Sequence, residues 1–558
     1  MRSVADPGLG RLGALKRLNT RPPVRRILTA WAACFAGEAI AAVAFGVLAY
    51  RSAGATGVAF LVAVQLVPTA ILAPLLVTVA EDVRRERLAF AVDVARAAVA
   101  AVAAAASEAG APREVLFALA AVLTVGTAVS NPLRRGLLPL LVEEPSELTA
   151  AGVVIGVVQA IAQTAGPLLA AVLFSVGGSW EVLVASAACF AVAALTEAGL
   201  PNTSEIAARP TAREAARITS ALHALAGGFR AMRSDSELAV VTGMFAAKNL
   251  GRGALNVLIV VIPLALLGLG SAGVGWLTAV LGGGGVAGGI LATALVGRRR
   301  LIPAMSVGLA LWGLPLIVLG GWPYLAVAVI GLAVLGAGNT ITDVAGYTLI
   351  GRSARDDLIA AVYSVHEAVR AGAIVVGSAA TAAIVELWGT RQALIVAGIG
   401  LAVAAAAAML LRSREHAREI RPEYMELIRA NPLFRWLPPI AVARLSSRLE
   451  TVELDEGDVL LREGDPGDCA YLLERGELVA DKGGLEIGRV RPGGVVGEIA
   501  LLHDAPRMAT VRAVTGCRLL MIERDEFLAA ATGNTGARDE AVQLVDRRLA
   551  EAAAATRV

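Results

Sequence analysis

Residues 27–50 read ILTAWAACFAGEAIAAVAFGVLAY, an apolar run with a single charged residue, Glu38. About 20 such residues are enough for an α-helix to cross the hydrocarbon core of a bilayer. The whole chain has the same character, because 56% of its 558 residues are hydrophobic and only 17% are charged, whereas soluble domains are roughly one quarter charged. The sequence therefore predicts an integral membrane protein.

Further apolar runs follow as far as residue 411, separated by charged residues, glycine or proline. A long polar segment, 201–238, divides them into two groups of six. Small residues, as in LGGGGVAGG at 281–289, let helix backbones approach closely in lipid. We expect an all-α polytopic membrane domain of 12 transmembrane helices, six plus six, near 27–50, 57–80, 88–106, 115–132, 148–174, 179–200, 239–268, 273–297, 301–320, 323–350, 358–386 and 391–411.

The composition changes near residue 412. The tail continues as a charged helix and then alternates short apolar runs, such as TVEL, DVLL, CAYLLE, ELVADK and LEIGRV, with glycine turns. This spacing predicts a small β-roll, with helices near 525–531 and 537–555. We therefore expect six parts: an N-terminal segment (1–26), the first six-helix half (27–200), an inter-half loop (201–238), the second six-helix half (239–411), a connector helix (412–432) and an α+β domain (433–558).

Basic residues indicate the orientation of the spans, since short cytoplasmic loops are enriched in Lys and Arg. One side of the predicted bundle holds only Arg51, Arg113 and Arg391. The other side collects many more, among them Arg25, Arg26, Arg84, Arg85, Arg87, Arg134, Arg135, Arg298, Arg299, Arg300, Arg352 and Arg355. We expect a multi-pass protein of the cell membrane with both termini in the cytoplasm.

Several function classes lack their sequence signatures. GLGSAG (268–273) and GGGVAG (283–288) fit the dinucleotide-binding pattern, but neither follows a strand in a βαβ unit. The chain has no phosphate-binding Walker motif, no His/Cys cluster with metal-ligand spacing and no nucleophile elbow. Its net charge is only +3. We predict that it is not an enzyme and has no metal, cofactor or nucleic-acid partner.

Several stretches of the membrane domain resemble the major facilitator superfamily. AEDVRRERLAFAVDVARA (80–97) is similar to its loop between spans two and three, although the usual glycine between acid and arginines is missing. The segments 131–152, 163–174, 274–289 and 362–379 are similar to its exporter branch. The resemblance covers about residues 25–411 and implies a transport cavity lined chiefly by spans one, four, seven and ten.

Charged residues inside spans are functional candidates, because a charge in the bilayer costs several kcal/mol unless it is paired or hydrated. Asp93 and Arg96 are three apart and are expected to pair. Glu38 has no basic residue near it in its own span, and we favour it for proton coupling. Candidates for coupling or for the substrate cavity are Glu38, Arg252, Asp343, Glu367 and Arg370, with a lesser role for His366; in the alternative interpretation, Asp343 and Glu367 pair with Lys248, Arg252 or Arg370 and lock helices together.

The tail contains VGEIALLHDAPRMATV at 496–511. Gly497 permits a tight turn, a short helical turn follows over 498–502, and Arg507 stands at the start of the next strand. Free N–H groups at a helix start favour an anion, and an arginine adds a charge-assisted contact to phosphate. Glu498 is unsuited to a phosphate but can accept a hydrogen bond from a sugar hydroxyl group.

This motif resembles the phosphate-binding cassette of cyclic nucleotide-binding domains, as found in catabolite activator proteins and regulatory subunits of cAMP-dependent kinase. The resemblance covers about 433–550. It implies that Glu498 binds the ribose 2′-hydroxyl and Arg507 the cyclic phosphate. Met508 replaces the threonine that cGMP-preferring relatives often carry, which favours cAMP. The implied site is Gly497, Glu498, Ile499, Ala500, Arg507, Met508, Ala509 and Thr510.

These features predict a cAMP-regulated secondary transporter that exports a small amphipathic compound in exchange for protons. The expected partners are cAMP, the small-molecule substrate and the lipid bilayer, and relatives of the tail domain often form homodimers. The alternative is a membrane-anchored cAMP receptor whose transporter-like domain no longer transports. A third interpretation makes cAMP itself the cargo.

Overall fold

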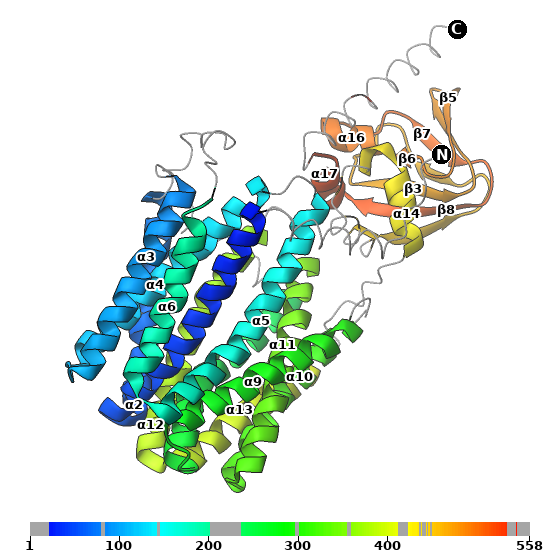
Figure 1. The fold of residues 1–558 in the computed structure, drawn as a ribbon. Coiled ribbons are helices and arrows are strands. Elements are labelled where there is room, and N and C mark those ends of the chain that lie inside the picture. Colours follow the sequence, from blue (N-terminus) through cyan, green and yellow to red (C-terminus); the bar gives the residue numbers. More distant parts are fainter. Residues whose placement is uncertain are drawn as a thin grey trace. The chain divides into compact units, whose positions relative to one another are not determined.

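Among the residues that the structure describes, helices dominate as far as residue 410, and strands dominate beyond residue 449 (Figure 1). The computed structural model describes residues 22–79, 84–141, 145–200, 236–295, 301–353, 359–410, 422–434 and 449–532, together with 437, 442, 445, 446 and 543. Contacts divide the chain into two units: a helical unit that contains most of residues 1–415, and a second unit that contains residues 416–558. Each is described separately below.

Eleven of the described helices are long and apolar enough to cross a membrane. The helix α2 is broken at Ala53 and at Gly54, which has a φ of 59°, so it consists of segments 22–52 and 55–79. Every expected span falls on one of these helical segments, and twelve crossings require α2 to cross twice. The elements are α2 (Pro22–Val79), α3 (Arg85–Glu108), α4 (Arg113–Leu141), α5 (Pro145–Val176), α6 (Ser179–Glu197), α8 (Ser236–Val261), η2 (Ile262–Leu266), α9 (Gly270–Ala292), η3 (Thr293–Leu295), α10 (Ile302–Gly321), α11 (Leu325–Ser353), α12 (Ile359–Trp388) and α13 (Thr390–Leu410).

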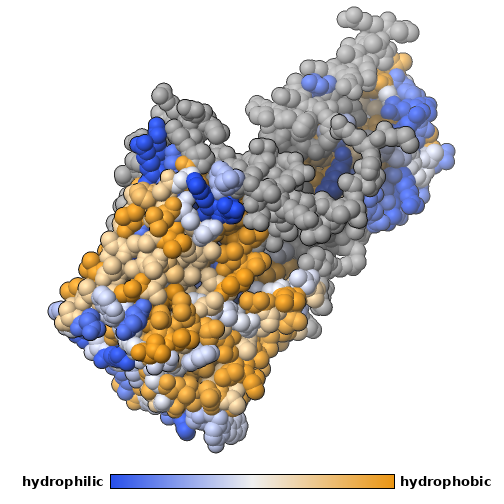
Figure 2. All heavy atoms as spheres, viewed as in Figure 1, coloured by the Kyte–Doolittle hydropathy of each residue, from blue (hydrophilic) through white to orange (hydrophobic). Residues whose placement is uncertain are grey.

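The helices of the first half pack around α2, which contacts α4, α5 and α6, while α3 packs against α4 and α6 (Figure 1). In the second half α13 packs against α10 and α8. Contacts of α5 with α9 and of α2 with α8 join the halves. The visible face of the helical unit is largely apolar (Figure 2). Large apolar side chains of this unit, such as Ile161, Leu195 and Ile290, are exposed. An apolar outer surface is what a lipid environment requires.

Glycines of α9 lie directly against α11. A Cβ atom on Gly284 would lie 2.0 Å from the carbonyl oxygen of Ala333, and one on Gly288 would lie 2.5 Å from the Cα atom of Ala337. Backbones can therefore meet here only because the side chains are absent. This confirms the packing role expected of the glycine-rich stretch 281–289 and leaves no dinucleotide-binding turn at 283–288.

The second unit is a roll of two four-stranded antiparallel sheets, with strand orders β1-β8-β3-β6 and β2-β7-β4-β5. All five strands expected from the apolar runs are present, and the helix expected at 525–531 is α17. The helix expected at 537–555 lies outside the described ranges apart from residue 543. The elements are β1 (Glu450–Leu454), β2 (Val459–Leu461), β3 (Cys469–Arg475), β4 (Leu478–Lys482), β5 (Leu485–Val490), β6 (Val495–Val496), α16 (Glu498–His503), β7 (Thr510–Ala513), β8 (Cys517–Glu523) and α17 (Arg524–Thr532).

The described part of the expected connector packs into the core of this second unit. Helix α14 (Pro422–Ala430) and the turn η5 (Pro432–Phe434) place Ile428 and Phe434 in one buried cluster with Phe527 of α17. The rings of Phe434 and Phe527 meet edge to face, with centroids 6.2 Å apart. Asn431 Nδ2 donates a 2.7 Å hydrogen bond to the carbonyl of Gly493. A segment expected to be a connector is therefore partly built into the strand-rich domain.

Candidate functional site

Gly497 joins strand β6 to helix α16 in a conformation that favours glycine, with a φ of 85°. A Cβ atom at this position would lie 2.5 Å from Nη1 of Arg507. The position thus excludes other residues twice, by its backbone conformation and by the guanidinium packed against it. Gly497 sets the start of α16 and makes room for Arg507.

Arg507 is 4% exposed and is held by main-chain carbonyl groups. Its Nη1 donates to the carbonyl of Gly497 at 2.9 Å, and its Nη2 donates to the carbonyl of Cys469 at 2.8 Å. Because β6 pairs with β3, Gly497 at the end of β6 lies close to Cys469 at the start of β3. They fix the guanidinium group without neutralising its charge.

The described carboxylate nearest to the Arg507 guanidinium is that of Asp468, with Oδ1 3.3 Å from Nη2. The Asp468 side chain is 86% exposed, and water screens such a pair strongly. The Cys469 thiol hydrogen bond, with Arg507 in a smaller part, lowers the pKa of Asp468. Burial raises the pKa values of the Cys469 thiol and the Tyr471 hydroxyl. Both neighbours are therefore neutral, and Arg507 keeps a positive charge that can attract an anion.

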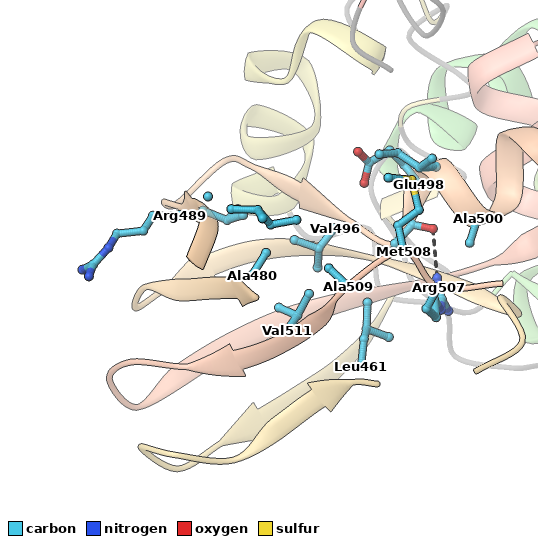
Figure 3. Close-up of a pocket in the computed structure, with 15 residues that line it drawn as sticks. Leu461, Ala480, Arg489, Val496, Glu498, Ala500, Arg507, Met508, Ala509 and Val511 are labelled. Atoms are coloured by element: carbon cyan, nitrogen blue, oxygen red, sulfur yellow. Dashed lines mark hydrogen bonds between the residues drawn. The ribbon is translucent and has the colours of Figure 1, made fainter. Parts of the chain in front are cut away.

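A cavity of about 140 Å³ opens beside Arg507 and Glu498 (Figure 3). Glu498 is the first residue of α16 and is 1% exposed. In Figure 3, Glu498, Met508 and Arg507 gather at one end of the cavity, and apolar side chains from the strands form the remaining wall. A cation and a carboxylate at one end of an apolar cavity fit an amphipathic ligand with an anionic group and a hydroxyl group.

Seven of the eight residues predicted for this site line the cavity, namely Gly497, Glu498, Ile499, Ala500, Arg507, Met508 and Ala509. Thr510 does not, since its hydroxyl group accepts a 3.2 Å hydrogen bond from the Glu463 N–H. The sequence analysis missed the wall supplied by the strands, which consists of Leu461, Ala480, Ile487, Gly488, Arg489, Val490, Val496 and Val511. Strand alternation could have suggested some of them. Arg489 turns its guanidinium away from the cavity (Figure 3) and pairs with Glu486 at 2.7 Å.

In the helical unit, charged side chains from four helices form one cluster, which we call the first-half charge cluster. Arg96 pairs with Glu38 at 2.7 Å and with Asp93 at 3.3 Å. Arg134 pairs with Asp93 and, at 2.7 Å, with Glu197. The pairing of Asp93 with Arg96 confirms the expectation from their spacing. The members of the first-half charge cluster are Glu38 of α2, Asp93 and Arg96 of α3, Arg134 of α4 and Glu197 of α6.

Two members of this cluster were not recognised from the sequence. Arg134 was counted among the basic residues that report orientation, but its side chain is fully buried. Glu197 lies at the end of α6 and is also fully buried. The Arg96 guanidinium stacks over the ring of Phe190 at 4.0 Å. Glu38 therefore does have a cationic partner, which comes from a neighbouring helix and not from its own span.

The candidates of the second half are largely paired. Asp343 of α11 pairs with Lys248 of α8, and Glu367 pairs with Arg370 at 2.7 Å within α12. Arg252 of α8 is exposed and has no hydrogen bond or ion pair with any residue in the described ranges.

His366 is 1% exposed, so its side chain is buried among the helices. Its ring packs edge to face against Phe245, with centroids 4.3 Å apart, and lies 5.4 Å from Tyr347. Neither ring nitrogen has a hydrogen-bond partner among the described residues.

The family models match both units. The model of the Major Facilitator Superfamily matches residues 27–378 and, in a second match, 244–447. The chain belongs to the major facilitator superfamily. The model of the cyclic nucleotide-binding domain matches residues 451–534, so the superfamily domain is fused to a C-terminal cyclic nucleotide-binding domain. This superfamily of transporters accounts for the apolar helices, and the domain accounts for the cavity beside Arg507.

Curated relatives match the C-terminal domain. The chain is 37% identical over 115 residues to a cAMP-dependent protein kinase regulatory subunit of Emericella nidulans, which covers 20% of this chain and 28% of the relative. It is 37% identical over 119 residues to the same subunit of Hypocrea atroviridis, covering 21% and 25%. The chain thus spans about a quarter of these relatives. A solved structure of the regulatory domain of Toxoplasma gondii PKA with cAMP is 35% identical, covers 19% of this chain and 43% of its own, and has a TM-score of 0.19.

Replacing Gly497 by alanine should weaken cyclic nucleotide binding by the full-length protein, because the new Cβ atom strains the backbone and displaces Arg507. Gly493 is the matched control, since its φ of 87° carries the same backbone strain but a Cβ atom there meets nothing within 4 Å. Titration with a fluorescent cyclic nucleotide should show a larger loss for Gly497→Ala than for Gly493→Ala. Equal losses would contradict the role assigned to the Gly497–Arg507 contact.

Proposed function

We propose that the protein is a secondary active transporter regulated by cAMP, which binds in the cytoplasmic C-terminal domain. The transporter exchanges protons for a small amphipathic compound and exports it across the cell membrane. The observation that carries the proposal is the buried, weakly balanced Arg507 beside Glu498 at one end of an apolar cavity. Because this site is fused to a domain of a transporter superfamily, we infer that its ligand regulates transport.

The chemistry of the cavity supports cAMP as the ligand. Arg507 supplies a fixed positive charge for the cyclic phosphate, and Glu498 supplies an acceptor for the ribose 2′-hydroxyl. Met508 adds an apolar side chain and no hydroxyl group that could select guanine. The relatives that match this domain are named as regulatory subunits of cAMP-dependent protein kinase, and this agrees with the assignment.

A series of contacts gives a route by which ligand binding could be transmitted. Helix α16, which carries Glu498, contacts α17, and α17 contacts η5 beside α14. Phe527 and Phe434 form the apolar part of this route. A ligand regulates transport only if it binds the inward-facing and outward-facing states with different affinity. Coupling of about 1–3 kcal/mol would change their ratio about 5- to 150-fold.

Proton coupling is assigned to the helical unit, with Glu38 as the principal candidate. Its side chain is 26% exposed, while Arg96 holds one of its oxygens at 2.7 Å. Proton uptake by Glu38 would weaken that pair and loosen α2 from α3. Arg252 and Asp343 of the second half are the proposed cavity contacts for the exported compound, with Glu367 and Arg370 beside them.

A second candidate function is a membrane-anchored cAMP receptor that does not transport. The pairs Lys248–Asp343 and Glu367–Arg370 favour it, since paired charges can simply lock helices together. The two functions share the cAMP site and differ in whether the helical unit moves protons.

Replacing Arg507 by alanine should weaken cAMP binding about 10- to 100-fold, the range expected for a lost hydrogen bond to a charged group. Calorimetric titration of the full-length protein in detergent measures it, with cGMP as a competing ligand expected to bind more weakly. Arg489→Ala is the matched control, because Arg489 lines the same cavity but directs its charge to Glu486. Unchanged binding in Arg507→Ala, or failure of the unaltered protein to bind cAMP, would contradict the ligand assignment.

Replacing Glu38 by glutamine should abolish proton movement while cAMP binding stays intact. Proteoliposomes with a trapped pH-sensitive dye would be supplied with a panel of amphipathic organic compounds, with and without cAMP. Glu386→Gln is the control, because Glu386 is an exposed carboxylate of α12 that accepts a hydrogen bond from Thr56. Proton movement unaffected by Glu38→Gln would refute the coupling role, and no movement under any condition would favour the receptor.

A further inference from the structure

The first-half charge cluster contains one more acidic group than basic groups. Its carboxyl groups belong to Glu38, Asp93 and Glu197, and its guanidinium groups to Arg96 and Arg134. Arginine stays protonated in proteins. Fully ionised, the cluster would therefore carry a net charge of −1. Since the side chains other than Glu38 are at most 2% exposed, a bound proton that restores neutrality is strongly favoured.

The hydrogen bonds distinguish the three carboxyl groups. Asp93 uses both oxygens: Oδ1 accepts from Arg96, and Oδ2 accepts from Arg134 and from the Cys34 thiol. Glu38 accepts from Arg96 through Oε1, and its side chain is 26% exposed. Glu197 accepts from Arg134 Nε through Oε1 at 2.7 Å, and its Oε2 is buried with no hydrogen-bond partner in the described ranges. An ionised oxygen in that position costs more than a neutral hydroxyl group.

Among the described residues, the surroundings of Glu197 supply no further cation to balance it. Helix α6 packs against α2, α3 and α5. The α2 and α3 groups that face the cluster are Cys34, Glu38, Asp93 and Arg96, and α4 adds Arg134. The part of α5 whose side chains are described, within 151–176, has no charged residue. Arg26 of α2 donates to the carbonyl of Gly199, which lies beyond the end of α6.

We propose that Glu197 carries a proton on Oε2 in the conformation described, and that Arg134 positions it. When the cluster becomes hydrated in another conformation, the O–H bond breaks and the proton passes to water, which leaves a carboxylate that binds Arg134 more strongly. Proton release thereby tightens α6 against α4. Only the use of this step in transport rests on the proposed proton-coupled function; the protonation itself does not.

Infrared difference spectroscopy tests the proposal, because a protonated carboxyl group has a carbonyl stretch that is distinct from that of a carboxylate. The full-length protein in lipid vesicles at neutral pH should show such a band for a buried carboxyl group. Glu197→Gln should remove it, Glu197→Asp should shift it, and Glu38→Asp and Glu386→Gln should leave it in place.

Persistence of the unshifted band in Glu197→Asp, a shift in Glu38→Asp, or absence of the band from the unaltered protein would each overturn the proposal. Glu197→Asp keeps the carboxyl group and thus guards against misfolding of Glu197→Gln. If the protein shows the band but moves no protons in proteoliposomes, the proposed proton on Glu197 would stand and the proposed transport function would fail. The two proposals can therefore fail separately.

Discussion

A guanidinium group removed from water must be given hydrogen-bond acceptors, and both units of this protein are organised around that requirement. In the C-terminal domain, Arg507 donates hydrogen bonds to the main-chain carbonyls of Gly497 and Cys469. In the helical unit, Arg96 and Arg134 form ion pairs with carboxyl groups of neighbouring helices. The acceptors differ in charge, and the difference has consequences for function.

Neutral acceptors leave a charge to attract a ligand, whereas carboxylates cancel it. Arg507 is fixed in place but remains electropositive, because its described acidic neighbour, Asp468, is exposed to solvent. Arg134 is fixed by Asp93 and Glu197, so its charge is balanced and ties three helices together. In the cluster around Arg134 the carboxyl groups outnumber the guanidinium groups by one, and we therefore propose that the cluster holds a proton. The same type of side chain is thus proposed to bind a ligand in one unit and connects helices in the other.

Much of this fold could be predicted from the sequence because its decisive signals are local. A run of about 20 apolar residues fixes a span wherever it occurs, and the stretch from Gly497 to Ala509 carries most of the chemistry of the nucleotide site in contiguous residues. The cavity wall from β2, β4, β5, β6 and β7 was missed because most of its members come together only when the strands pair into the sheet β2-β7-β4-β5. Arg134 and Glu197 were missed for a related reason. From the sequence alone, a charged residue near the end of a span is easily taken for a residue at the membrane surface, because its partner helix is not known.

Nucleotide occupancy of the cavity and its effect on the helices are open to one direct measurement, hydrogen–deuterium exchange of the full-length protein in nanodiscs with and without saturating cAMP. The account predicts slower amide exchange in α16 and β7, where the ligand binds, together with altered exchange in helices of the transporter domain. Exchange that changes in neither unit would contradict the claim that this transporter-family protein is regulated by cAMP. A change confined to the C-terminal domain would contradict the coupling between the units.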